Sequence, residues 1–136
     1  RQCTGLAIRA GLEWALSQAR SHSVVVSGFQ SPLERSVLEL LLQAGSPAVL
    51  VLARPVKSAR LPATWSAALE RQHLTIISAL AETRRLDREG ASARNEIVAQ
   101  LAHNITIAHA APGGRLETHA QAWCSSGKSV HILDVA

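Results

Sequence analysis

The sequence predicts an α/β domain with a doubly wound, mostly parallel sheet and helices on both faces. Short apolar runs alternate with longer amphipathic stretches along the chain, and such alternation favours parallel strands joined by helical crossovers. The apolar runs are continuous, as expected for strands that are covered on both faces. With 136 residues and neither a repeat nor a linker, residues 1–136 are predicted to form one Rossmann-like domain.

Each predicted element has a local reason in the sequence. The best-marked helix starts at Pro32, because Ser31 can cap it and Glu34 can complete a capping box, and it ends at Gly45. The other expected helices cover about residues 4–21, 64–71, 92–103 and 116–125, with Thr64 and Ser92 as caps. Apolar runs predict strands at residues 24–26, 48–53, 74–78, 105–110 and 130–133, and the Arg-rich stretch 82–91 is expected to be a mobile loop.

Composition limits the classes of protein to which the chain can belong. The apolar fraction of 47% indicates a globular domain, and no apolar run reaches the roughly 18 residues of a membrane span. Cys3 and Cys124 lack CxxC spacing, which favours free thiols in a reducing cytoplasm, although one disulfide between them remains an alternative. The chain contains no Met, so we expect it to be a fragment.

The basic residues favour an anionic partner. The formal charge is +4, and twelve Arg stand against two Lys. Arginine suits bidentate contacts with phosphate. A GC-rich genome would produce the same bias, so composition alone does not decide between the two explanations.

Three segments are expected to meet at the carboxyl edge of the sheet, where ligands bind in open α/β folds. Ser27 and Gly28 follow one strand, and Gly113 and Gly114 follow another, so bare backbone N–H groups can face an anion there. Arg94 and Asn95 lie near the expected start of a helix, where a cation opposes the helix dipole and so suggests a binding role. Thr118 can donate a hydroxyl. Ordinary turns and a solvated Arg remain the alternatives.

Other chemistries lack their motifs. The chain has no GxSxG elbow, no P-loop and no GxGxxG fingerprint. Its histidines show no HxxxH spacing, so we predict no metal and no cofactor. His109, at a strand end, is the one histidine of interest. Four aromatic residues are too few for a base-stacking platform of the RRM or OB kind.

Five segments carry a family resemblance. Residues 24–34 (VVVSGFQSPLE) are similar to a strand with an SGxAxGxD loop, and residues 94–99 (RNEIVA) to an RNRIIA motif. Residues 114–118 (GRLET) are similar to SGSLxT, 127–130 (GKSV) to GRxV, and 1–5 (RQCTG) to the end of a GSRxxS loop. In this order they resemble the DNA-processing protein DprA (Smf) family over nearly the whole chain.

The resemblance implies a domain that binds single-stranded DNA in a basic pocket and, in that family, helps to load a RecA-type recombinase. It also implies that the chain begins after the first strand, so that the central strand of the sheet is expected to be missing or disordered. Glu96 departs from the second Arg of RNR, and Glu34 from an Asp. Carried over by position, the phosphate pocket comprises Arg1, Ser27, Gly28, Arg94, Asn95, Gly114 and Thr118.

We therefore expect a binding module, not an enzyme, that recognises single-stranded DNA or a nucleotide phosphate in recombination or DNA uptake. The Pro112–Gly114 turn is also similar to the PGG loop of LOG-type phosphoribohydrolases, but Thr118 follows Gly114 by four residues instead of three. The alternatives are a LOG-like nucleoside-monophosphate hydrolase, with Glu117 or Glu34 as acid/base, and a nucleotide-sensing domain. The apolar content leaves room for a homodimer.

Overall fold

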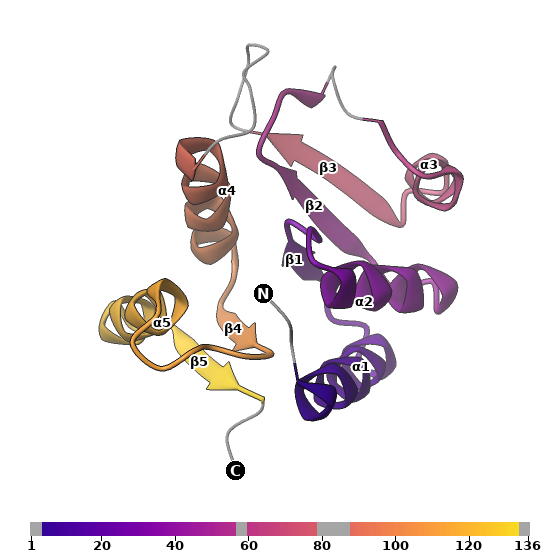
Figure 1. The fold of residues 1–136 in the computed structure, drawn as a ribbon. Coiled ribbons are helices and arrows are strands. Elements are labelled where there is room, and N and C mark those ends of the chain that lie inside the picture. The colour runs from indigo at the N-terminus through magenta and orange to yellow at the C-terminus, as the bar shows by residue number, and fades with distance from the viewer. Residues whose placement is uncertain (1–3, 57–59, 79–87, 134–136) are drawn as a thin grey trace.

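The computed structural model describes residues 4–56, 60–78 and 88–133, in which helices and strands alternate (Figure 1). The helices are α1 (Gly5–Arg20), α2 (Pro32–Gln43), α3 (Ala63–Glu70), α4 (Arg88–Leu101) and α5 (Arg115–Ser125). The strands are β1 (Val25–Ser27), β2 (Ala48–Leu52), β3 (Leu74–Ser78), β4 (Asn104–Ile107) and β5 (Ser129–Ile132). The predicted α/β class is confirmed.

The strands form two parallel sheets. β1, β2 and β3 pair in that order, with Val25 opposite Ala48 and Ala48 opposite Leu74. β4 and β5 form the second sheet, with Asn104 opposite Ser129. Figure 1 shows α1, α2 and α3 on one side of the strands and α4 and α5 on the other.

Most of the core lies between the first sheet and the helices α1 to α3. Leu38 and Leu41 of α2 are fully buried against Leu50 of β2 and Leu74 of β3. Burying each such side chain stabilises the fold by about 1.5–3 kcal/mol relative to exposing it. Among the described helices, none has the length and apolarity needed to cross a bilayer.

The predicted start of α2 is confirmed in detail. The hydroxyl of Ser31 accepts from the backbone N–H of Glu34 at 3.2 Å, and the Glu34 carboxylate accepts from the Ser31 N–H at 3.1 Å. Pro32 occupies the first turn, where its missing N–H has no cost. This capping box fixes the position of the Glu34 carboxylate at the end of β1.

One predicted helix start and one predicted cap were wrong. α4 begins at Arg88, about one turn before the expected Ser92 cap. Gly90 argued for a loop, but it is buried inside the helix, where packing can offset its low propensity. The remainder of the expected loop, residues 82–87, lies outside the described residues. α3 is capped by Pro62, and the Thr64 hydroxyl instead donates to Glu39 at 3.1 Å.

A cleft of about 1230 Å³ separates the two sheets. Val25 and Val26 of β1 line one wall, and Ile105 and Ile107 of β4 line another. In the described part of the chain β1 pairs with β2, and β4 pairs with β5, so the strand edges that border this cleft are unpaired. The expectation that a central strand is missing stays a prediction.

Candidate phosphate-binding site

The turn after β1 has a tightly determined shape. The Ser27 hydroxyl accepts from the N–H of Phe29 at 3.1 Å and donates to the Glu34 carboxylate at 3.0 Å. Phe29 has a positive φ of 47°, although it is not a glycine. Such backbone costs of order 1–3 kcal/mol and persists only where its surroundings impose it. The turn is therefore held in one conformation by Ser27, by the capping box and by the buried Phe29 ring.

Arg94 of α4 lies directly against this turn. A Cβ atom added to Gly28 would stand 2.7 Å from both Cδ and Nε of Arg94, so only glycine leaves room for that side chain. The Arg94 guanidinium donates from Nε and Nη2 to the Asn95 Oδ1, each at 3.3 Å. These contacts bring Ser27, Gly28, Arg94 and Asn95 together at the carboxyl end of β1, as predicted.

The electrostatics of Arg94 are those of a partly desolvated cation. Burial lowers the pKa of the Arg94 guanidinium from its usual range, and the negative charge of Glu34 opposes that effect. The guanidinium remains protonated near neutral pH. Among the described residues Arg94 forms no ion pair within 4.0 Å. A half-buried cation without an ion-paired carboxylate can gain from binding an anion.

The prediction that Arg94 opposes the helix dipole was wrong. Because α4 begins at Arg88, Arg94 lies in the second turn of the helix, beyond the reach of the N-terminal dipole. Its position is explained by packing over Gly28. Glu96, which replaces an Arg of the motif, is exposed and does not line the cleft, so its carboxylate does not face Arg94 across the site.

The glycine loop before α5 belongs to the other half of the structure. Gly113 has a φ of 72°, which favours glycine, and Gly114 caps α5 without a side-chain bond. The Gly113 N–H donates to the Glu117 carboxylate at 3.3 Å, and the Thr118 hydroxyl donates to the Gly114 carbonyl at 3.3 Å. Glu117 thus occupies one of the donors expected for an anion.

The predicted site residues are only partly brought together. Ser27, Gly28, Arg94 and Asn95 line the cleft between the sheets. The glycine loop reaches it through neighbouring residues, Ala111 and Leu116, and His109 also lines it. Gly113, Gly114 and Thr118 are not among its lining residues, and Arg1 lies outside the described residues.

The described residues contain no group of three or more His, Cys, Asp or Glu that could hold a metal ion. Cys124 is an exposed free thiol. Cys3 lies outside the described residues, so the disulfide alternative stays untested.

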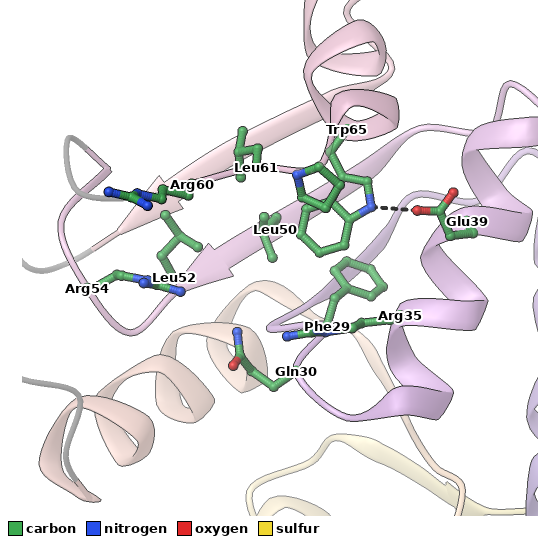
Figure 2. Close-up of a pocket in the computed structure, with 11 residues that line it drawn as sticks. Phe29, Gln30, Arg35, Glu39, Leu50, Leu52, Arg54, Arg60, Leu61 and Trp65 are labelled. Carbon is green, nitrogen blue, oxygen red and sulfur yellow. Dashed lines mark hydrogen bonds between the residues drawn. The ribbon is translucent and has the colours of Figure 1, made fainter.

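Sequence reasoning missed a second pocket, on the face covered by α2 and α3. Arg35, Arg54 and Arg60 line it together with apolar side chains (Figure 2). Arg54 follows β2, so it stands at the same carboxyl edge as Ser27. The general rule about strand ends could have drawn attention to this segment.

The fold and the site define a Rossmann-like α/β domain with a basic side chain at the carboxyl edge of a parallel sheet. The sequence profile of the DNA recombination-mediator protein A family matches residues 1–136. The chain belongs to this family, so the resemblance inferred from the motifs is confirmed.

A solved structure agrees with this assignment. The X-ray structure of DNA processing protein A (DprA) from Streptococcus pneumoniae matches with a TM-score of 0.75 at 17% sequence identity. The match covers 96% of this chain and 46% of that chain, so the 136 residues span about half the length of the relative. At this identity the match shows the fold alone. No curated protein sequence matches the chain.

Proposed function

We propose that the turn at Gly28, with Arg94 above it, binds a backbone phosphate of single-stranded DNA. The observation that carries the proposal is the half-buried Arg94 guanidinium, which packs against a glycine and has no ion pair among the described residues. Family membership favours DNA over a free nucleotide as the source of that phosphate. Loading of a RecA-type recombinase and a homodimer remain expectations.

The geometry suits a phosphate for two reasons. A guanidinium presents parallel N–H donors that match two phosphate oxygens, and partial desolvation strengthens such charge-assisted bonds. Gly28 has no side chain, so the Arg94 side chain can lie directly against the turn, which holds its guanidinium at the end of β1. Glu34 is the nearby negative charge, but its two oxygens are engaged by Ser27 and by the Ser31 N–H.

The test is fluorescence anisotropy of a labelled oligothymidylate at several salt concentrations, with wild type, Arg94→Ala and Arg71→Ala. Arg71 is exposed at the end of α3, on the opposite edge of the sheet, and supplies the same change of charge. We expect wild-type affinity to fall steeply with salt. Arg94→Ala should lose about tenfold in affinity and reduce the salt slope by about 0.7 for one phosphate contact, while Arg71→Ala should match wild type.

Absence of wild-type binding at low salt, or binding that ignores salt, would remove the DNA proposal. Thymidine monophosphate serves as a competitor in the same assay. If it displaces the oligonucleotide at comparable phosphate concentration, the site is a nucleotide sensor instead.

The hydrolase alternative receives no specific support. Both candidate carboxylates are engaged in the protein, Glu34 by Ser27 and the capping box and Glu117 by the Gly113 N–H. We expect no base release when the protein is incubated with nucleoside monophosphates. Release by wild type that is lost in Glu117→Gln would replace the binding proposal with a catalytic one.

A further inference from the structure

A second pocket opens between α2, β2 and the start of α3, with a volume of about 230 Å³ (Figure 2). Its floor is apolar and well packed. Phe29 is 1% exposed and Trp65 is 8% exposed, and Leu50 and Leu52 of β2 lie beside them. The indole N–H of Trp65 donates to the Glu39 carboxylate at 2.9 Å, which fixes the ring.

The rim of this pocket is cationic. Figure 2 shows Arg35 of α2 and Arg54, after β2, reaching toward the same opening, with Gln30 between them and Arg60 directed away. All three arginines are exposed, and none forms an ion pair among the described residues. The one carboxylate in the lining, Glu39, is occupied at Oε1 by Trp65 and Thr64.

These features together fit one phosphate group. A guanidinium group supplies the parallel N–H donors that a phosphate accepts, and two such groups, those of Arg35 and Arg54, border this opening. The apolar floor removes water from one side of the opening, which strengthens the attraction to an anion. The volume is below the roughly 300 Å³ of the smallest ordinary ligand pockets, which leaves room for a single compact group and not for a nucleoside.

The pocket is connected to the Arg94 site through one short turn. Gly28 lies under Arg94, whereas the next residue, Phe29, places its ring in the floor of the pocket. The positive φ of Phe29 produces this change of direction. The Gln30 amide, on the rim, donates back to the Gly28 carbonyl at 3.3 Å. The two sites therefore lie on either side of residues 28–30, at the same carboxyl edge.

We propose that Arg35 and Arg54 form a second phosphate subsite, so that one DNA strand crosses the turn at residues 28–30 and contacts both faces. The choice of DNA as ligand rests on the proposed function. The subsite itself rests on the pocket, the two guanidinium groups that border it and its apolar floor.

The test compares the double variant Arg35→Ala/Arg54→Ala with Arg20→Ala/Arg71→Ala. The control pair is exposed, removes the same charge and ends α1 and α3 at the opposite edge of the sheet. Binding of labelled oligothymidylate is measured by anisotropy against salt concentration. We expect the pocket double variant to lose about tenfold in affinity, roughly threefold for each exposed contact, and to reduce the salt slope by about 1.4. The control should change neither quantity.

Equal losses in the two double variants would overturn the subsite, because they would reflect net charge alone. Wild-type binding that is unaffected by Arg35→Ala/Arg54→Ala but lost in Arg94→Ala would overturn the subsite and leave the proposed function intact. Thermal unfolding of each variant checks that the fold survives.

A second measurement separates the two proposals when DNA does not bind at all. The Trp65 indole N–H resonance reports directly on the pocket, and it can be followed while inorganic phosphate or thymidine monophosphate is added. A saturating shift that disappears in Arg35→Ala/Arg54→Ala supports the subsite with a small phosphate ligand as its source. No shift with either compound, and no binding of DNA, overturns it.

Discussion

The two halves of the structure differ in how completely they are packed. The half built from α1 to α3 and β1 to β3 contains nearly all of the buried apolar side chains, among them Leu38, Leu41 and Leu50. In β4, α5 and β5, the buried apolar residues among those described are Ile107 and Ala120. The first half therefore carries its own core, whereas the second turns many of its apolar side chains toward the cleft.

The core that stabilises the fold and the candidate site lie in different parts of the molecule. The Arg94 site lies where the well-packed half meets the cleft, and its turn is anchored in the first half by Ser27, Phe29 and the capping box. Binding groups held by a rigid element keep their geometry. The less packed half is expected to open more easily, because it buries fewer apolar contacts.

The largest expected effect tests this difference in packing. Leu41→Ala removes a side chain that is 0% exposed in the main core, and it should cost roughly 2–5 kcal/mol of unfolding free energy. Ile105→Ala, at a half-buried position in β4 that lines the cleft, should cost less than half as much. Urea denaturation followed by circular dichroism measures both. Equal costs would show that the two halves share one core.

The second prediction concerns the close approach of Arg94 to the turn. Gly28→Ala would place Cβ 2.7 Å from two atoms of the Arg94 side chain and displace it. DNA affinity should fall about tenfold, which corresponds to about 1.4 kcal/mol. Gly5→Ala is the matched control, because no atom lies within 4 Å of its added Cβ. Wild-type affinity in Gly28→Ala would mean that Arg94 acts from another position.

Helix capping provides a smaller contrast between the halves. Ser31→Ala removes the side-chain cap of α2 and should lower the free energy of unfolding by about 1 kcal/mol. The same substitution at Ser36, which is exposed within α2, should have little effect. Thermal or urea unfolding distinguishes the two variants. A negligible loss at position 31 would indicate that tertiary packing alone holds the turn.

The corresponding change in the second half should stabilise it slightly. Gly114 caps α5 in an extended conformation without a side-chain hydrogen bond. Gly114→Ser would add that bond and gain a few tenths of a kcal/mol, roughly the difference between serine and glycine caps. Urea unfolding measures the gain. If DNA affinity falls in this variant while stability rises, Gly114 approaches the ligand directly.

The smallest expected effect concerns pH. Burial lowers the pKa of Arg94 in the folded state relative to the unfolded state. The contribution of this group to the free energy of unfolding therefore rises with pH only in the alkaline range between these two pKa values. The guanidinium is fully protonated in both states below that range. The affinity ratio of wild type to Arg94→Ala should therefore be constant from about pH 6 to about pH 9. A ratio that changes across this interval would show that a group other than Arg94 controls binding.

The sequence predicted those features whose causes are local. The start of α2 depends on hydrogen bonds between Ser31 and Glu34, three residues apart, so it could be read from the residue types alone. The apolar runs predicted β2 and β3 correctly. Four of the five residues of β2 are buried, as expected for a continuous apolar strand that is covered on both faces. The start of α4 was missed, because the cost of Gly90 is offset by burial that no local pattern reveals.

The sequence by itself determined the α/β class and the family. It also indicated that Ser27, Gly28, Arg94 and Asn95 lie in strand and helix segments that face the carboxyl edge of the sheet. Only the tertiary structure decided that Arg94 packs over Gly28, and that Arg35 and Arg54 share an opening on the other face. The physical reason is the range of the interactions. Caps and strand runs depend on neighbours along the chain, whereas burial and charge clustering depend on how separate elements pack against each other.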